Sequence, residues 1–186
     1  MKNLIRETNK KIRREMIKSE VAAKSAAASL NFLETDIYKS ANLIMAYMPL
    51  GNETDTADII KQSFADGKKV ALPVTNQITG EIAPHIITEK TKFRPGAFYV
   101  DEPTDSQIAD ISEIDVVIVP GIAFDGTGNR VGFGKGCYDM FLENSHAIKV
   151  GFCYEFQFAD DIPADKHDIK MDYVITENKL YKCNNR

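Results

Sequence analysis

The sequence has few cysteines, no tryptophan and no long apolar run. Its three cysteines, Cys137, Cys153 and Cys183, show no Cys-x-x-Cys spacing. We therefore expect neither a disulfide framework nor a structural zinc site. The chain also lacks a stretch of about 18 uncharged apolar residues that could cross a membrane, and its first residues do not resemble a secretion signal. These absences indicate a cytoplasmic protein that does not enter membranes.

The composition is that of a folded protein. Hydrophobic residues make up 44% of the 186 residues and charged residues 27%, which argues against intrinsic disorder. The length fits a single domain over residues 1–186, since typical domains contain roughly 100–200 residues. No internal repeat or low-complexity tract divides the chain.

Short apolar runs alternate with amphipathic or polar stretches. We expect strands at 43–48, 70–74, 81–88, 116–119, 149–152 and 173–176, the last two being the final strands. One helix is expected within residues 1–18 and a second from a cap at Ser19. A third is expected over 58–64 with its end at Gly67, and a fourth from about Tyr138. The Pro-, Gly- and Asp-rich segment 94–111 resembles a long surface excursion. Because Val/Ile-rich runs are separated by helices, the pattern favours an α/β fold with a largely parallel sheet covered on both faces.

The N-terminal segment concentrates positive charge. Residues 1–18 have a net charge of +5, whereas the rest of the chain has −9 and the whole chain −4. Their apolar residues recur at helical intervals, which is typical of an amphipathic helix with a solvated basic face. Nucleic-acid binding requires a basic surface over more of the domain, and the overall acidity argues against it. A third interpretation is that one or two of these cations reach an anionic substrate in a cleft.

Five of the eleven glycines lie between residues 126 and 136. This stretch follows the expected strand at 116–119, and open α/β sheets bind ligands at the carboxyl ends of their strands. Glycine lets backbone N–H groups approach a phosphate closely, while Arg130 and Lys135 add positive charge. A helix from about Tyr138 would direct the positive end of its dipole at the same loop. The pattern indicates an anion site, with a mobile surface loop as the alternative.

Two common phosphate-binding motifs do not fit this stretch. A Walker A loop has Ser or Thr after its Gly-Lys pair, whereas Gly136 follows Lys135 here. A dinucleotide fingerprint that starts at Gly132 has glycine or another small residue at position 137, and Cys137 breaks that pattern.

Four segments together carry a more specific signal. The longest reads Pro-Gly-Ile-Ala-Phe-Asp at 120–125 and Asn-Arg-Val-Gly-Phe-Gly-Lys-Gly-Cys-Tyr-Asp at 129–139. The others are Lys-Asn-Leu-Ile-Arg at 2–6, Glu-Thr-Asp-Thr at 53–56 and His-Asp-Ile-Lys-Met-Asp at 167–172. These segments extend over nearly the whole chain. Taken in chain order, they resemble the motifs of the 5-formyltetrahydrofolate cyclo-ligase family, also called methenyltetrahydrofolate synthetase.

The resemblance implies a three-layer α/β/α fold of the NagB/RpiA/CoA-transferase-like type. It also implies an ATP- and Mg²⁺-dependent ligase that converts 5-formyltetrahydrofolate to 5,10-methenyltetrahydrofolate and releases ADP and phosphate. Phosphorylation of the formyl oxygen makes a good leaving group, and folate N10 then attacks the activated carbon. The implied partners are small molecules, with no nucleic acid, no membrane and no obligate protein partner.

The same resemblance assigns roles to residues. Lys135, Arg130 and Tyr138 are the expected catalytic residues, and Asp139 and Asp168 the expected Mg²⁺ ligands. The expected ATP-binding residues are Lys2, Asn3, Leu4, Ile5, Arg6, Arg130, Val131, Gly132, Phe133, Gly134, Lys135, Gly136, Cys137 and Tyr138. The expected folate-binding residues are Met48, Glu53, Phe133, Gly134, Lys135, Gly136 and Cys137.

Several of these residues also have a structural interpretation. Asp139 could cap or charge a helix N-terminus, and Asp168 could be an ordinary loop carboxylate. Glu53 could begin the next helix, and Met48 could belong to the core. Lys2 lies so near the chain end that it could be disordered.

The chain departs from the family pattern at one position. The family usually has two successive tyrosines before the aspartate, where this chain has Cys137 and Tyr138. Loss of an aromatic ring could weaken stacking against the substrate. A catalytically weak folate- or nucleotide-binding protein is therefore a second hypothesis. A third is a small-molecule kinase that uses the same glycine-rich loop on another acceptor.

Overall fold

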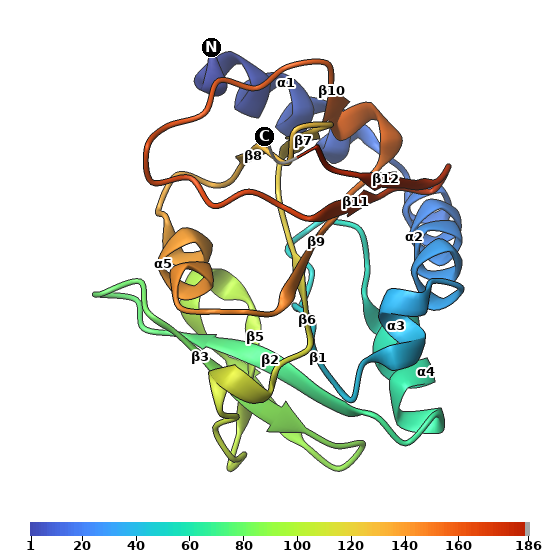
Figure 1. Cartoon of the computed structure of the whole chain (residues 1–186), viewed down its shortest axis with the longest axis vertical. Coiled ribbons are helices and arrows are strands. Elements are labelled where there is room, and N and C mark those ends of the chain that lie inside the picture. Colours follow the sequence, from blue (N-terminus) through green and yellow to red (C-terminus); the bar gives the residue numbers. More distant parts are fainter. Residues whose placement is uncertain (185–186) are drawn as a thin grey trace.

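Seven strands form the central sheet in the order β12-β11-β9-β6-β1-β2-β3 (Figure 1). The computed structural model describes residues 1–184. The strands are β1 (Leu43–Met45), β2 (Lys69–Thr75), β3 (Ile82–Ile87), β6 (Val116–Val119), β9 (Ile148–Phe152), β11 (Tyr173–Ile175) and β12 (Leu180–Lys182). The five inner strands pair in parallel, and only the edge strands β3 and β12 are antiparallel to their neighbours. The prediction of a largely parallel sheet is confirmed.

Helices lie on both faces of this sheet (Figure 1). On one face are α2 (Lys18–Leu33), α3 (Asp36–Ser40) and α4 (Ala57–Ala65), and on the other is α5 (Cys137–Glu143). The three-layer α/β/α architecture is therefore confirmed. No helix within residues 1–184 has the length and apolar character needed to cross a bilayer.

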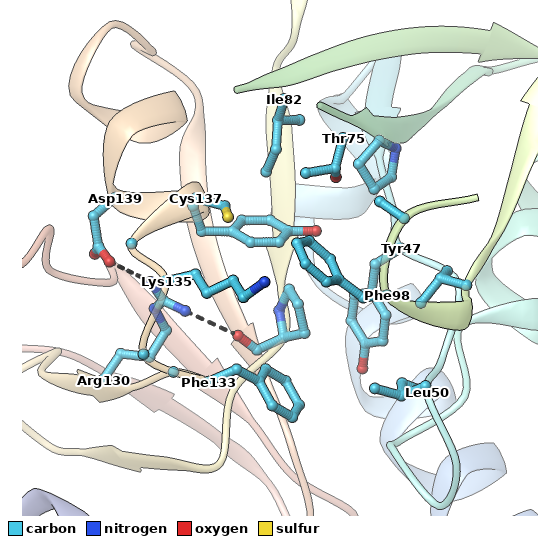
Figure 2. Close-up of a pocket in the computed structure, with 18 of the residues that line it drawn as sticks. Tyr47, Leu50, Thr75, Ile82, Phe98, Arg130, Phe133, Lys135, Cys137 and Asp139 are labelled. Carbon is cyan, nitrogen blue, oxygen red and sulfur yellow. Dashed lines mark hydrogen bonds and ion pairs between the residues drawn. The ribbon is translucent and has the colours of Figure 1, made fainter. Parts of the chain in front are cut away.

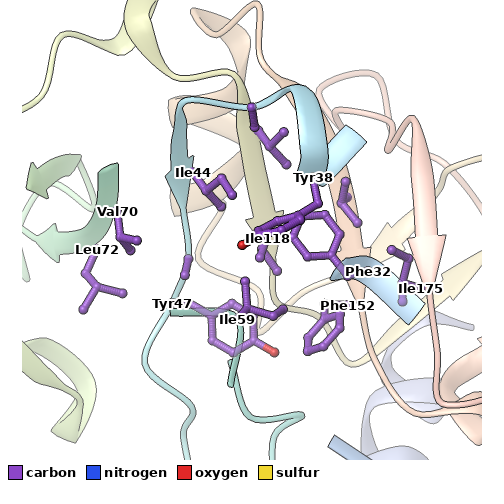
Figure 3. Close-up of a cluster of buried hydrophobic side chains, with 14 of the residues drawn as sticks. Phe32, Tyr38, Ile44, Tyr47, Ile59, Val70, Leu72, Ile118, Phe152 and Ile175 are labelled. Atoms are coloured by element: carbon purple, nitrogen blue, oxygen red, sulfur yellow. The ribbon is translucent and has the colours of Figure 1, made fainter. Parts of the chain in front are cut away.

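The inner strands are buried on both faces because successive side chains point to opposite sides. Ile44 of β1 joins a core cluster with Phe32 of α2 and Ile59 of α4 (Figure 3). The next residue, Met45, joins a second cluster that contains Leu142 of α5. Each of these side chains is at most 1% exposed. This two-sided burial explains why the strands are continuous apolar runs in the sequence.

The helix α1 (Lys2–Glu15) lies against a separate small sheet. That sheet has the order β10-β7-β8, formed by β10 (Phe158–Ala159), β7 (Ala123–Asp125) and β8 (Arg130–Val131). Ile5 packs against a cluster that contains Ile122, Val131 and Ile162. The buried Asn9 amide donates to the carbonyl oxygen of Ile122 at 2.9 Å. α1 is thereby fixed to the segment that also carries the glycine-rich loop.

Most element boundaries agree with the prediction to within a residue, but two differences change the interpretation. Helix α2 begins at Lys18 with Ile17 as its N-cap, so Ser19 lies inside the helix and does not cap it. The strand expected over 43–48 ends at Met45. It ends early because the chain turns away from the sheet, and the carbonyl oxygen of Tyr47 accepts a hydrogen bond from the Thr56 hydroxyl.

The segment 94–111 was expected to be a long surface excursion. Most of its residues are at least partly exposed, as expected, but the segment also contains regular structure and buried side chains. β4 (Lys92–Pro95) and β5 (Asp101–Thr104) pair as an antiparallel hairpin around the 3-10 turn η1 (Ala97–Tyr99). A second turn, η2 (Ile111–Glu113), follows. Ala97 and Glu102 are buried, because the hairpin packs beside β2 instead of extending into solvent.

The C-terminal part also has more strands than expected. Strand β12 follows β11 and closes the edge of the sheet, and the turn η3 (Glu155–Gln157) and strand β10 lie between β9 and β11. β12 has only partly buried and exposed residues. Because such a short edge strand lacks an apolar run, it is difficult to predict from the sequence.

The close packing of β9 under Phe124 yields a stability prediction. A Cβ at Gly151 would lie 2.6 Å from the Phe124 ring, which is fully buried and has no free space to move into. We expect Gly151→Ala to lower the free energy of unfolding by about 1–3 kcal/mol in urea denaturation. Gly126→Ala is the control, since its Cβ would meet only Phe158, at 3.8 Å. Equal losses in both variants would contradict the packing argument.

Candidate active site

A cleft of about 460 Å³ lies at the carboxyl ends of β1, β2 and β6. This is where open α/β sheets place their ligands. Six parts of the chain meet there: α1, the segment after β1, the end of β2 with the start of β3, the β4–β5 hairpin, the glycine-rich loop and the segment around 165–168. The cleft is therefore built from residues far apart in the sequence (Figure 2).

Most of the predicted site residues line this cleft. They are Lys2, Arg6, Met48, Glu53, Arg130, Gly132, Phe133, Gly134, Lys135, Gly136, Cys137, Tyr138, Asp139 and Asp168.

Four predicted ATP-binding residues do not line the cleft. Of the first helical turn of α1, Lys2 and Arg6 line the cleft, whereas Asn3, Leu4 and Ile5 do not. Ile5 packs on the small sheet instead. Val131 is buried in that same cluster, because alternate residues of β8 point to opposite sides.

Other residues of the cleft wall were not predicted from the sequence. The additional lining residues are Tyr47, Leu50, Pro73, Thr75, Ile82, Ala97, Phe98, Val100, Glu102, Pro120 and Asp165. Glu102 is 7% exposed, and its Oε1 accepts a hydrogen bond from the backbone N–H of Thr75 at 2.8 Å. No sequence motif marks this contact, because it depends on the hairpin lying beside β2.

The Arg130 guanidinium fixes one wall of the cleft (Figure 2). It donates to Asp139 Oδ2 at 3.0 Å and to the carbonyl oxygen of Pro120 at 3.3 Å. Its side chain is 7% exposed, and Nε has no hydrogen-bond partner. These contacts join the end of β6 and strand β8 to the first turn of α5. Asp139 lies within that turn, so it does not cap the helix, whose N-cap is Gly136.

Lys135 extends across the cleft toward the β4–β5 hairpin (Figure 2). Its ammonium lies 4.0 Å from the centroid of the Phe98 ring, a cation–π contact. Gly134 and Gly136 flank it with φ of 103° and 68°, left-handed conformations that favour glycine. Within residues 1–184 the ammonium forms no ion pair with a carboxylate. Its charge is therefore available to an anionic ligand.

Opposite the loop lies a buried carboxyl group. Glu53 Oε2 accepts a hydrogen bond from the Leu50 N–H at 2.8 Å, and Oε1 lies 3.6 Å from the Arg13 guanidinium without a hydrogen bond. Burial raises the pKa of Glu53, and Arg13 and the Leu50 N–H oppose that rise. Glu53 does not begin the next helix, because α4 starts at Ala57.

Two tyrosines stand near Glu53. The Tyr138 hydroxyl is buried and has no hydrogen-bond partner, and burial raises its pKa far above the usual value. The Tyr47 hydroxyl donates to the carbonyl oxygen of Thr54 at 2.6 Å and belongs to the core cluster as well as to the cleft wall. Met48 likewise packs on the core and lines the cleft. Two buried polar atoms on this side, Glu53 Oε1 and the Tyr138 hydroxyl, thus lack a hydrogen bond.

Lys2 is held by two carboxylates at the rim of the cleft. Its Nζ donates to Asp165 Oδ2 at 2.5 Å and to Asp168 Oδ2 at 2.6 Å. Burial alone would raise the pKa of Asp168, but the hydrogen bonds from Lys2 and the Asp165 N–H lower it overall. Burial acts to lower the pKa of Lys2, yet the two carboxylates outweigh it and raise it. Lys2 therefore has a defined position in the site.

The two predicted metal ligands, Asp139 and Asp168, both line the cleft. Asp139 Oδ1 accepts a hydrogen bond from the N–H of Ile169, the neighbour of Asp168, so both carboxylates lie in one part of the cleft. No group of three or more His, Cys, Asp or Glu residues among residues 1–184 forms a ready metal cage. Mg²⁺ usually keeps several waters and takes one or two carboxylates together with phosphate oxygens. The donor set fits such an ion, and a cation, the Lys2 ammonium, already lies between Asp165 and Asp168.

The first part of the glycine-rich stretch lies outside the cleft. The buried Asp125 carboxylate accepts hydrogen bonds from the backbone N–H groups of Thr127, Asn129 and Ile162, and from the side chains of Thr127 and Asn129. These bonds shape the turn between β7 and β8, where Gly128 has a φ of 84°. Only the part from Arg130 onward contributes to the cleft wall.

Comparison with known proteins places this chain in one family. Residues 1–177 match the family model described as the 5-formyltetrahydrofolate cyclo-ligase family. The 5-formyltetrahydrofolate cyclo-ligase of Saccharomyces cerevisiae is 30% identical, and the match covers 94% of each chain. The Escherichia coli protein of the same name is 28% identical over 76% of this chain and 81% of its own. The solution structure of Aquifex aeolicus 5,10-methenyltetrahydrofolate synthetase superposes with a TM-score of 0.87 at 28% identity, covering 100% of this chain and 94% of the other.

Because Asp125 accepts these hydrogen bonds, we expect that loss of its charge lowers the stability of the fold. Asp125→Asn replaces one oxygen by an N–H₂ group that faces donors, so we expect the free energy of unfolding to fall by about 2–3 kcal/mol. Urea denaturation measures this loss. Asp161→Asn, which removes the same charge from an exposed side chain, should leave stability nearly unchanged. A small effect at Asp125 would show that the turn holds without its carboxylate.

Proposed function

The chain belongs to the 5-formyltetrahydrofolate cyclo-ligase family, and on that premise we propose that its cleft binds ATP beside 5-formyltetrahydrofolate and closes the folate to 5,10-methenyltetrahydrofolate. One observation carries the proposal: a loop with an unpaired ammonium, that of Lys135, faces a buried carboxyl, Glu53, within a single cleft. The ammonium suits a triphosphate, and the buried carboxyl suits the polar edge of a pterin. The chain is thus an enzyme of the ATP-dependent ligase class.

The triphosphate is assigned to the glycine-rich side of the cleft. Arg6 Nε donates to the carbonyl oxygen of Gly132 at 2.8 Å, which holds α1 against the loop. Arg6 and Lys135 thereby line this side of the cleft, together with Lys2, whose charge is balanced by Asp165 and Asp168. An ammonium suits a single phosphate oxygen and a guanidinium a pair of them.

The pterin ring is assigned to the Glu53 side. Its ring N–H and amino groups are donors that a carboxylate can accept together. Glu53 Oε1 lacks a hydrogen bond, so such donors would satisfy a buried atom that is otherwise left without one. Met48 and Tyr47 supply apolar surface next to it.

The chemistry follows from the weakness of the formyl oxygen as a leaving group. That oxygen attacks the γ-phosphorus of ATP, the bond to the bridging oxygen breaks, and ADP leaves. Folate N10 then attacks the activated carbon, the carbon–oxygen bond breaks, and phosphate departs with the oxygen. N10 loses its proton as the five-membered ring closes. Phosphoryl transfer requires little covalent chemistry from the protein, so catalysis depends mainly on positioning and charge stabilisation.

The residues of this chain divide that work. Lys135 places its ammonium by the transferring phosphoryl group, and Arg130 holds the loop through Pro120 and Asp139. The Tyr138 hydroxyl is protonated at neutral pH, since the ordinary pKa of tyrosine is about 10 and burial raises it further, and it would donate a hydrogen bond to the reacting oxygen. Asp139 and Asp168 would hold Mg²⁺, which neutralises charge on the phosphate oxygens when bound.

A direct assay tests the function and the role of Lys135. The purified chain with 5-formyltetrahydrofolate, ATP and Mg²⁺ should form methenyltetrahydrofolate, whose near-ultraviolet absorbance reports turnover. Lys135→Met should reduce kcat at least tenfold, or about 1.4 kcal/mol of barrier, with unchanged unfolding. Lys61→Met, at an exposed position on α4, is the control. Folate binding without product would favour a weak binding protein, and ATP consumption only with another acceptor would favour a kinase.

A metal titration tests the two aspartates. Asp139→Asn and Asp168→Asn should each raise several-fold the Mg²⁺ concentration needed for half-maximal rate at saturating ATP. Asp139 also holds Arg130, so a lower kcat alone would not identify a ligand; the shift of the titration midpoint is the readout. Asp161→Asn should leave the midpoint in place. An unmoved midpoint in both cleft variants would reject the ligand assignment.

A further inference from the structure

Arg13 is a buried cation to which the proposed catalytic steps assign no role. It lies in the last turn of α1, and its side chain is 9% exposed. Its guanidinium carbon lies 5.7 Å from the centroid of the Phe133 ring, and Nη1 lies 3.6 Å from Glu53 Oε1. Arg13 therefore contacts both the glycine-rich loop and the carboxyl group to which the pterin is assigned.

The contact between Arg13 and Glu53 is an ion pair without a hydrogen bond. Nη1 donates to the carbonyl oxygen of Gly121 at 3.4 Å instead, and Glu53 Oε1 has no hydrogen-bond partner. The other carboxyl oxygen, Oε2, accepts from the Leu50 N–H. A charge acts across this distance in a buried, poorly screened region even where no hydrogen bond forms. Arg13 can thus stabilise the negative charge of Glu53 and still leave Oε1 for the donors of a ligand.

The other titratable groups near Glu53 carry no charge at neutral pH. Burial raises the pKa of the Tyr47 and Tyr138 hydroxyls, and that of Tyr154, whose hydroxyl donates to the backbone carbonyl oxygen of Glu53 at 3.1 Å. In the part of the chain that the structure describes, Arg13 is the one cation in ion-pair contact with Glu53. Burial raises the pKa of Glu53, and Arg13 is the charged group that opposes the rise.

The backbone holds the two partners of this pair in place. The Asn52 side-chain amide donates to the carbonyl oxygens of Arg13 and Met16, at 2.8 and 3.0 Å. These bonds tie the end of α1 to the loop directly before Glu53. The separation between the guanidinium and the carboxyl group is therefore set by the fold.

We propose that Arg13 is a positioning residue for the folate, which keeps the Glu53 carboxyl ionised while leaving Oε1 unoccupied for the N–H donors of the pterin. The inference rests on the proposed function, in which Glu53 binds the pterin. A protonated Glu53 would carry a donor of its own and offer the pterin fewer acceptors. Arg13 does not line the cleft, so it acts through Glu53.

Two substitutions that differ in charge test the proposal. Arg13→Met and Arg13→Lys both remove the guanidinium, but Arg13→Lys keeps the positive charge. We expect Arg13→Met to raise the pKa of Glu53 by about 1–3, the typical effect of an adjacent opposite charge, and Arg13→Lys to change it much less. An NMR titration of the carboxyl carbons measures this pKa, with the Glu53 resonance assigned by its absence from Glu53→Gln.

Folate binding should follow the same titration. In wild type, KM for 5-formyltetrahydrofolate should rise as the pH falls through the pKa of Glu53, and in Arg13→Met the rise should begin at a pH about 1–3 higher. Arg13→Lys should remain close to wild type, and Glu53→Gln should have a high KM without this pH dependence. For both Arg13 variants we expect kcat and KM for ATP to stay unchanged.

The control is Lys11→Gln, which removes a charge from an exposed position of α1 outside the cleft. It should match wild type at every pH. A KM for folate that rises equally in Arg13→Met and Arg13→Lys, and equally at every pH, would assign Arg13 to packing alone and overturn the proposal.

Stability gives a second test that remains decisive if Arg13→Met folds poorly. Above neutral pH, Arg13→Met buries a carboxylate without its cation, which is costly. The double variant Arg13→Met/Glu53→Gln removes that charge and should be more stable than Arg13→Met in urea denaturation. A double variant that is less stable than Arg13→Met, or that also fails to fold, would contradict the coupling of the two side chains.

The NMR titration needs neither folate nor ATP, so it separates this inference from the proposed function. Product formed by wild type, with an unmoved Glu53 titration in Arg13→Met, rejects the role of Arg13 alone. No product from wild type, with a Glu53 titration that moves in Arg13→Met and not in Arg13→Lys, rejects the proposed function and retains the effect of Arg13 on Glu53.

Discussion

The ion pair between Arg130 and Asp139 is the interaction on which the site depends. With the carbonyl oxygen of Pro120 it joins β6, β8 and α5, and the loop that carries Lys135 lies between these anchors. Removing two charges from water is costly, so such a pair is weak evidence for stability. Its effect here is to fix geometry: the backbone between its two ends has little freedom, and Lys135 is held at the cleft.

Helix α1 explains the uneven charge of the chain. Lys2 and Arg6 of this helix line the candidate active site, and Lys10, Arg13 and Arg14 line a second cavity beside it. The rest of the chain is acidic, and Asp165 and Asp168 hold Lys2 at the rim. The concentration of cations on one helix thus places positive charge where anionic substrates would bind, while the overall charge stays negative. Of the interpretations open for the N-terminal segment, the one in which cations reach a cleft agrees with this placement.

The parts of the site that could be predicted are those with a continuous motif. The loop from Arg130 to Asp139 was found because its residues are adjacent in the sequence, and Glu53 because it lies in a short motif after a strand. Phe98 and Glu102 were missed. Both lie on a hairpin with no apolar run, and their place in the cleft depends on packing beside β2. Asn3, Leu4 and Ile5 do not line the cleft, and a motif does not say which helix face meets a ligand.

The sequence by itself determined the layers and the parallel sheet, because strands buried on both faces must be apolar at every position. It also showed the concentration of glycine at 132–136, and the left-handed backbone angles of Gly134 and Gly136 in the structure explain two of these glycines. Only the tertiary structure decided that Lys2 meets Asp168, that Lys135 faces Phe98, and that a second basic cavity adjoins the first. Such contacts join residues distant along the chain, and local spacing carries no information about which distant surfaces meet.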